Sequence, residues 1–484
     1  MNLKAISRNV GLALLVSAFF MLLSLVVSVI YGNDGGFLPL LVSLVITFIA
    51  GAFPFIFVTA PQPIGLKDGF VTIVLSWLLS FVFGMMPYVM WGGEISLVDA
   101  WFESVSGFTT TGATILKDIE AMPHSLLFWR SSTHFIGGLG VVVFLLLIVP
   151  SASPFRKRLS RMEFSSMSRE GFQIQTRKLV KVIAGVYIGI FVLSSLSLFL
   201  CGMSLFDAVN HGFSICATGG FSTKNASIAA FDSPLINVVT LVFLVIATTN
   251  FLLLFTCLST RSLRPVLRSG VMRFYILSIL SISLIVVFSL KLQGESMSWG
   301  RAFMEGFCTT VSYITTTGFC FADNSGWPYF ASVLLMYASI QCGCAGSTSS
   351  GIKVDRMIVM FRSIGRQIKN HLHPGNVRGI RLNGSYMSDE QVMPMILYVV
   401  LYFVILFLAT GFLLIAGVGG IEAVSGSVAC LGNVGPGLGA ISLAGNYDAM
   451  PVAAKLIYSL EMFLGRIEIY PVLIAVYLIF NRDK

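Results

Sequence analysis

The sequence predicts an all-α polytopic membrane protein from three observations: an apolar composition, apolar runs of membrane-spanning length, and a short motif that occurs four times. Of the 484 residues, 56% are hydrophobic and only 11% are charged, and the mean hydropathy is +0.87. Soluble domains carry about 25% charged residues. Most of this chain is therefore expected to lie within a membrane.

Ten apolar runs are long enough to cross about 30 Å of hydrocarbon at 1.5 Å per residue. They cover residues 9–31, 37–59, 69–92, 124–150, 180–202, 233–258, 272–293, 328–360, 391–418 and 452–480. The first run is longer than the apolar region of a signal peptide, and no small-residue cleavage site precedes the second run. We therefore expect the first run to remain as a helix.

Basic residues are concentrated on one side of the expected topology. Of 31 Lys and Arg residues, 24 lie in the two termini and in four loops, at 60–69, 151–181, 259–273 and 353–390. Acidic residues predominate on the other side. This positive-inside pattern places both termini in the cytoplasm. The net charge of +9 thus reflects membrane orientation and contact with anionic membrane lipid, and no nucleic-acid partner is expected.

A short semi-polar stretch with a Gly/Thr-rich end recurs between alternate pairs of apolar runs. The stretches align without gaps on four glycines, Gly112, Gly220, Gly318 and Gly435. Five further columns also match, and the column two residues before the glycine holds Thr110, Thr218, Thr316 and Asn433. The stretches are too short and polar to span. They fit re-entrant hairpins, because non-helical backbone is tolerated at membrane depth only where it is buried or lines water.

The fold expected from this repetition is an N-terminal helix pair followed by four helix–pore helix–filter–helix repeats with pseudo-fourfold symmetry around one pore. The helix pair is expected at 1–60. The four repeats are expected at 61–155, 156–260, 261–385 and 386–484.

Four glycine turns at one depth suit the passage of a monovalent cation. Potassium must shed its hydration shell in a narrow pore, and a ring of backbone carbonyls can replace the lost oxygens. Glycine tolerates the positive φ that lets successive carbonyls point the same way. No carboxylate occupies these turns, which argues against a divalent-ion or proton path. The alternatives are glycines that serve helix packing and flanking side chains that only cap the backbone. The candidate K⁺-binding residues are Thr110, Thr111, Gly112, Thr218, Gly219, Gly220, Thr316, Thr317, Gly318, Asn433, Val434 and Gly435.

The same motifs carry a family resemblance. The runs Gly-Phe-Thr-Thr-Thr-Gly-Ala-Thr at 107–114, Ala-Thr-Gly-Gly-Phe-Ser-Thr at 217–223, Thr-Thr-Thr-Gly-Phe at 315–319 and Gly-Asn-Val-Gly-Pro-Gly-Leu-Gly at 432–439 resemble the four filter motifs of the Trk/Ktr/HKT superfamily of potassium transporters. The resemblance extends to residues 137–140, 344–348 and 465–468. The extra N-terminal helix pair resembles the bacterial TrkH/TrkG branch.

The resemblance implies potassium uptake across the bacterial cytoplasmic (inner) membrane. It further implies a homodimer with one pore in each subunit, and a separate cytosolic nucleotide-binding regulatory subunit of the TrkA type. Potassium is the permeant ion, and no organic cofactor is expected in this chain. A glycine at position 112, where some sodium-preferring plant relatives have serine, favours K⁺.

The resemblance also implies a gate below the filter. Its parts are an intramembrane loop, where relatives often have Gly-Gly in place of Ser349-Ser350, and an arginine that forms an electrostatic barrier. The alternatives are close packing of small residues in this segment, and an ion pair of the arginine with Glu461 or Glu468. The candidate gating residues are Gly343, Gly346, Ser349, Ser350, Gly351, Lys353 and Arg466.

Two other functions remain open at this point. The first is a potassium symporter coupled to H⁺ or Na⁺ by alternating access, although such carriers often have inverted rather than parallel repeats. The second is an intramembrane enzyme, but the sequence contains no P-loop, nucleophile elbow or paired catalytic carboxylates. We therefore expect a transporter and not an enzyme.

Overall fold

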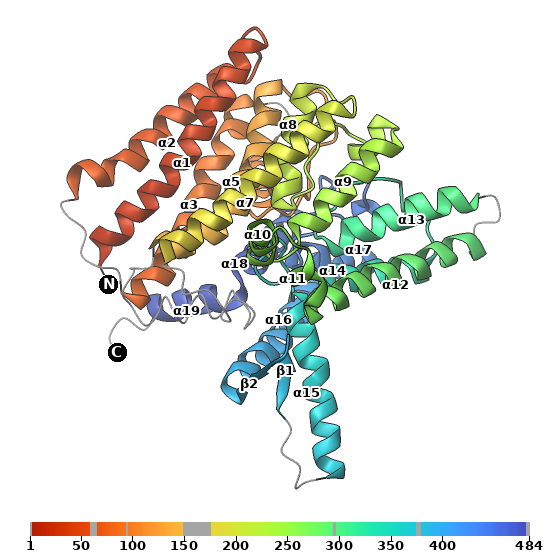
Figure 1. The fold of residues 1–484 in the computed structure, drawn as a ribbon. Coiled ribbons are helices and arrows are strands. Elements are labelled where there is room, and N and C mark those ends of the chain that lie inside the picture. The colour runs from red at the N-terminus through yellow and green to blue at the C-terminus, as the bar shows by residue number, and fades with distance from the viewer. Residues whose placement is uncertain are drawn as a thin grey trace.

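The computed structural model describes residues 2–58, 65–92, 95–148, 176–293, 297–373 and 379–480. It is built almost entirely from helices, which form an N-terminal pair and four units of similar design (Figure 1). Within these residues, six helices are long and apolar enough to span a membrane, and a seventh span exists if one sharply bent helix pair is counted. The all-α polytopic architecture expected from the sequence is confirmed.

The N-terminal pair consists of α1 (Leu3–Ile30) and α2 (Phe37–Phe57). Gly11 and Gly51 lie where the two helices cross, and a Cβ on Gly51 would stand 3.0 Å from the carbonyl oxygen of Gly11. Small residues allow two helix backbones to approach this closely. α1 also packs against the first unit, so the pair covers one side of the molecule (Figure 1).

Each unit contains a long helix, a short re-entrant helix and a second long or broken helix. The first unit is α3 (Leu66–Trp91), α4 (Leu97–Phe108) and α5 (His124–Ile148). The second is α7 (Thr176–Leu200), α8 (Leu205–Ala217), α9 (Pro234–Ala247) and α10 (Phe251–Thr260). The third is α12 (Gly270–Gln293), α13 (Trp299–Ile314), α14 (Tyr329–Gln341) and α15 (Val354–Leu372). The fourth is α16 (Asp389–Ile415), α17 (Gly420–Leu431), α18 (Val452–Ile467) and α19 (Ile469–Phe480).

Serine caps determine where three of the four short helices begin. The side chains of Ser96, Ser204 and Ser298 each accept a hydrogen bond from the backbone N–H three residues later. At Ser96, Asp99 completes a capping box. Such caps satisfy N–H groups that a helix start leaves without partners. These three short helices therefore start at capped ends and run into the buried centre of the molecule.

The second helices of units two, three and four are broken. The apolar runs at 233–258 and 452–480 predicted single spans, whereas an intramembrane loop was expected within the run at 328–360. α9 and α10 meet at an angle of 101°. A loop at 342–353 separates α14 from α15, and Glu468, at φ 66°, separates α18 from α19. Hydropathy averages over these breaks, because the few Thr, Ser, Gly and Asn residues that form them are diluted by apolar neighbours.

A small β-hairpin follows α15 and was not predicted from the sequence. Strands β1 (Ile380–Leu382) and β2 (Ser385–Met387) pair antiparallel with Ile380 opposite Met387. Asn383 and Gly384 both have positive φ, as a two-residue type I′ turn requires. Three further short elements are η2 (Ser227–Phe231), α11 (Arg264–Arg268) and η3 (Gly439–Ile441). The predicted boundaries at 60/61 and 155/156, and most of the basic loop 151–181, lie outside the described residues.

Candidate functional site

The four short helices end in the same way. Two residues before the filter glycine, the backbone turns left-handed, with φ of 51° at Thr110, 54° at Thr218, 57° at Thr316 and 52° at Asn433. The N–H of the next residue then donates to the carbonyl five residues earlier. These bonds join Thr111 to Ser106 (2.9 Å), Gly219 to Ser214 (2.8 Å), Thr317 to Ser312 (3.0 Å) and Val434 to Ala429 (2.8 Å). Together these features are a Schellman motif, which satisfies the last carbonyls of a helix.

Threonine is an unusual residue for the left-handed position of this motif. A β-branched residue with positive φ is a genuine outlier, and such strain costs about 1–3 kcal/mol per residue. Three of the four units accept this cost at the same place, at Thr110, Thr218 and Thr316. Strain repeated at one position of a fold is characteristic of functional sites rather than of ordinary packing.

The four filter glycines form a closed ring of contacts. Their φ values are 81° at Gly112, 87° at Gly220, 71° at Gly318 and 96° at Gly435. A Cβ on each glycine would meet a carbonyl oxygen of the next unit. The oxygens met belong, in the same order, to Gly219, Thr317, Val434 and Thr111. The contacts thus run from unit one to two, three, four and back to one.

The oxygens in this ring come from the residue just before each glycine. This residue does not have a positive φ, whereas the residue before it and the glycine after it do. The sign of φ therefore alternates along these three residues of each segment. No backbone N–H in the described part of the chain donates to these four oxygens. They are buried carbonyl acceptors that are available to a cation.

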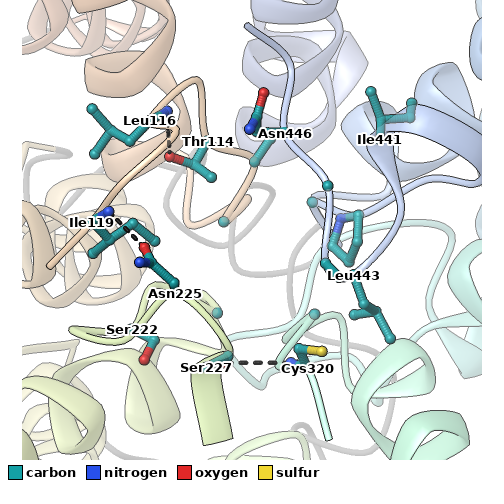
Figure 2. A pocket seen from close by; sticks show the side chains of 18 of the residues that line it. Thr114, Leu116, Ile119, Ser222, Asn225, Ser227, Cys320, Ile441, Leu443 and Asn446 are labelled. Atoms are coloured by element: carbon teal, nitrogen blue, oxygen red, sulfur yellow. Dashed lines mark hydrogen bonds between the residues drawn. The ribbon is translucent and has the colours of Figure 1, made fainter. Parts of the chain in front are cut away.

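Just outside the ring lies a cavity of about 120 Å³, which all four filter glycines help to line. Figure 2 shows the loops around it and two of the bonds that join neighbouring units, Ile119 N–H to Asn225 Oδ1 (2.6 Å) and Cys320 N–H to Ser227 Oγ (3.3 Å). The bond from Tyr447 N–H to the Thr114 carbonyl (2.8 Å) joins unit four to unit one. These bonds hold the outer rims of the filter segments in register.

The charges at this outer mouth are of both signs. Lys117 pairs with Asp448 at 3.0 Å, and Lys224 pairs with Glu120 at 3.3 Å. A hydrogen bond from Asn225 to Asp118 holds the pKa of this exposed carboxyl below its usual value. The mouth therefore presents ionised carboxylates at neutral pH.

Two filter positions differ between units for visible reasons. At Gly219, where the other units have Thr or Val, a Cβ would overlap the imidazole ring of His134. Asn433 replaces the threonine of the other units, and its Nδ2 donates to Thr111 Oγ1 (2.9 Å) and to the Met462 carbonyl (2.8 Å). The four repeats are thus equivalent in backbone and different in side-chain packing.

The loop at 342–353 packs into the break between α9 and α10. Cys344 N–H donates to the Thr248 carbonyl (3.1 Å), Phe251 N–H to the Gly346 carbonyl (3.0 Å), and Asn250 Nδ2 to the Ala345 carbonyl (2.8 Å). The backbone of this buried loop is therefore satisfied by a neighbouring unit, as membrane depth requires.

Arg466 is buried and its guanidinium reaches the same loop. It donates to the Thr348 carbonyl (2.7 Å), to Ser350 Oγ (3.0 Å) and to the Gly137 carbonyl (3.3 Å). The cavity among this arginine, the loop and Gly138 measures only about 20 Å³, which holds about one water molecule. The loop and the arginine therefore leave only this small cavity between them.

The serines of the loop take part in this contact. Ser347 Oγ and Ser349 Oγ lie 2.9 Å apart, and Ser350 accepts from Arg466. Glycine at 349 and 350 could make neither bond. The loop still contains left-handed glycines, with φ of 76° at Gly346 and 69° at Gly351.

Glu468 binds the far end of the loop. It lies 3.2 Å from Lys353 Nζ and 2.7 Å from Arg356 Nη2, and all three side chains are largely buried. The break between α18 and α19 is thereby tied to the start of α15. One alternative from the sequence was an ion pair of Arg466 with Glu461 or Glu468. The ion pairs that the structure shows for Glu468 are with Lys353 and Arg356.

A buried ion pair joins Glu103 and Arg130 at 2.6 Å, and His134 is also buried. Neither feature was predicted from the sequence. Glu103 lies in a re-entrant stretch and Arg130 in an apolar run. A charge at such depth is expensive and marks a structural or functional role. That signal was present in the sequence.

Comparisons with known proteins agree on one family. Residues 40–484 match the TrkH family model, described as cation transport protein. The Trk system potassium uptake protein TrkH of Escherichia coli K12 is 35% identical over 385 residues, 78% of each chain. The Halomonas elongata TrkH is 32% identical over 477 residues, 98% of each chain. The crystal structure of the potassium transporter TrkH from Vibrio parahaemolyticus superposes with a TM-score of 0.88 at 30% identity, over 98% of each chain.

The contact ring predicts that Gly318 cannot be replaced without loss of stability. Gly318→Ala places a methyl group against the Val434 carbonyl and Pro436 and forces a left-handed alanine, which costs at least about 1–2 kcal/mol. We expect a lower melting temperature in detergent. Gly326→Ala is the matched control, because a Cβ there has nothing within 4 Å. Equal melting of the two variants would contradict the ring.

Proposed function

The chain belongs to the TrkH family of cation transport proteins, and on that premise we propose that it conducts K⁺ inward through a pore lined by its own backbone carbonyls. The family consists of transporters and not enzymes. The single observation that carries the proposal is the closed ring in which each filter glycine abuts a carbonyl oxygen of the next unit. A ring of such oxygens at one depth can replace the hydration shell of potassium.

The short helices add to the attraction for a cation. All four end at the ring, and the C-terminal end of a helix carries a partial negative charge. Thr110, Thr218, Thr316 and Asn433 supply the turn below each glycine, and the residues that follow them supply the oxygens. Because the four units run parallel around one ring, the arrangement favours a pore over the alternating access of an ion-coupled symporter.

The gate in this proposal is the loop at 342–353 together with Arg466. The buried guanidinium is a fixed positive charge in a region of low effective dielectric, where it repels a permeant cation strongly. Its bonds to Thr348 and Ser350 hold the loop in the closed position.

The proposal includes a homodimer in the inner membrane with both termini in the cytoplasm. In Figure 1 the start of α1 and helix α19 lie at the lower left of the molecule, and α15 projects downward from it. α15 exposes an apolar stripe on this projection, formed by Phe361, Ile364, Ile368 and Leu372. A second copy of the chain would cover that stripe. A cytosolic regulatory subunit of the TrkA type would bind the basic residues of this projection.

Gly112→Ser tests the filter. A side chain at this glycine would meet the Gly219 carbonyl, which should disturb the spacing of the ring and let Na⁺ compete with K⁺. The measurement is K⁺ uptake into liposomes with and without Na⁺, and with and without a proton gradient. Gly326→Ser is the control. A folded Gly112→Ser variant with unchanged K⁺/Na⁺ discrimination would remove this glycine from the filter, and wild-type flux that requires a gradient would favour a symporter.

Arg466→Ala tests the gate. Loss of the fixed charge and of the bonds to the loop should raise K⁺ flux several-fold, since both the electrostatic barrier and the loop contact are removed. Arg466→Lys separates the two effects, because it keeps the charge but cannot make the same set of hydrogen bonds. A folded Arg466→Ala variant with wild-type flux would make this arginine purely structural.

Neutralising the cytoplasmic cations tests the regulator. Replacing Arg362, Arg366 and Lys369 of α15 with glutamine should weaken co-purification with a TrkA-type subunit and reduce the nucleotide dependence of flux. Arg301, an exposed residue paired with Glu305 at the N-terminus of α13, is the control for surface charge. If wild type forms no complex with the subunit, or if flux ignores nucleotide in its presence, the regulatory part of the proposal is wrong.

A further inference from the structure

A buried ion pair lies directly behind the filter on one side of the ring. Glu103 is on α4, nine residues before Gly112, and Arg130 is on α5. Glu103 Oε1 lies 2.6 Å from Arg130 Nε, and both side chains are 1% exposed. Taking two charges out of water is costly, and well-packed apolar residues would often stabilise the fold as well or better. The pair therefore calls for a role beyond general stability.

Each member of the pair holds the chain just beyond a filter glycine. Glu103 accepts hydrogen bonds from Thr114 Oγ1 and from Ile115 N–H, all at 3.1 Å, which fixes the exit of the first filter segment. Arg130 Nη1 donates to the Ser222 carbonyl at 3.0 Å, and its guanidinium carbon lies 3.5 Å from the centre of the Phe221 ring. The pair thus connects the filter segments of units one and two to each other.

The position that corresponds to Glu103 in the other three units holds an uncharged residue, and the hydrogen bonding of that residue decreases from unit two to unit four. In unit two it is His211, whose Nε2 lies 2.9 Å from Ser222 Oγ, two residues after Gly220. In unit three it is Thr309, whose hydroxyl has no hydrogen-bond partner in the described part of the chain. In unit four it is Gly426, and the space a side chain would need is filled by Tyr458.

We propose that Glu103 and Arg130 are positioning residues that set K⁺/Na⁺ discrimination by fixing the filter carbonyls of units one and two. The proposal rests on the proposed function, since it concerns the same filter. Phe221 directly follows Gly220, and Thr114 lies two residues after Gly112, so a shift at either residue moves the carbonyls of the ring. The buried pair thus lies behind the filter segments of units one and two, whereas the positions that correspond to Glu103 in units three and four hold the neutral residues Thr309 and Gly426.

The chain offers a matched control for this test. Asp99 lies on the same short helix, at its outer, N-terminal end, and forms a second buried ion pair at 2.5 Å with Lys455 of α18. Asp99→Asn therefore breaks a buried pair on α4 without touching the segments that follow the filter glycines. Glu103→Gln breaks the inner pair and keeps the shape of the side chain.

The experiment measures K⁺ uptake and its inhibition by Na⁺ in liposomes, together with melting in detergent, for wild type and both variants. We expect Glu103→Gln to lower K⁺/Na⁺ discrimination about tenfold, which corresponds to about 1.4 kcal/mol. Asp99→Asn should lose comparable stability and keep wild-type discrimination. If both variants lose discrimination equally, selectivity follows the packing of α4 in general and the assignment to this pair is overturned.

If Glu103→Gln does not fold, Arg130→Lys and Phe221→Leu test the same role, because both change the contacts between Arg130 and the segment after Gly220. Lysine keeps the charge beside Glu103 but cannot also reach Ser222 and cover the Phe221 ring, so discrimination should fall while the ion pair survives. Folded Glu103→Gln or Arg130→Lys protein with wild-type discrimination overturns this inference alone. A wild type that carries no K⁺ overturns the proposed function as well, so the two failures are distinguishable.

Discussion

The structure depends on one constraint: four stretches of non-helical backbone must meet at membrane depth with their carbonyls unpaired and close together. Hydrocarbon supplies no hydrogen bonds, so every other polar group near these carbonyls needs a partner within the protein. The Schellman ends of the short helices meet this need below the ring, and bonds between neighbouring units meet it above. The four carbonyls of the ring accept no backbone N–H from the residues that the structure describes.

A single chain with four unequal repeats can meet this constraint differently at each position around the ring. In unit two, Gly219 makes room for His134, and in unit four, Asn433 bonds across to Thr111. In a homotetramer, either substitution would appear at all four positions of the ring, because the subunits are identical. The asymmetry extends to the groups behind the filter, which range from the Glu103–Arg130 pair in unit one to Gly426 in unit four.

The sequence was sufficient to predict the helix pair, the repeated units and the column of filter glycines, because each depends on local residues at fixed spacing. The sequence also contains the Asn383-Gly384 turn of the β-hairpin, but a pattern of apolar runs does not predict so short a polar turn. The left-handed threonines were not predictable in this way. Threonine avoids that conformation on its own, and it is held there by hydrogen bonds and by packing from other units.

The contacts around the proposed gate could not be predicted from the sequence for a related reason. Arg466 meets residues more than 100 positions away in the sequence, and Glu468 pairs with Lys353 and Arg356 over similar separations. No periodicity links such residues. The break in unit three was expected as an intramembrane loop, whereas the breaks between α9 and α10 and between α18 and α19 were not predicted, because they lie within apolar runs. The first two of these breaks exchange backbone hydrogen bonds with each other, and the side chain of Glu468 ties the third to Lys353 and Arg356.

The proposed gate follows from the same constraint as the filter. A buried guanidinium is tolerable only while it is hydrogen-bonded, and Arg466 donates to two groups of the loop at 342–353, the Thr348 carbonyl and Ser350 Oγ. If the loop moves away, those bonds must be replaced, and water entering the widened space is the available replacement. Water also screens the positive charge from a passing cation. In the proposed gate, movement of the loop and removal of the electrostatic barrier are therefore one event, because the arginine is hydrogen-bonded to the loop itself.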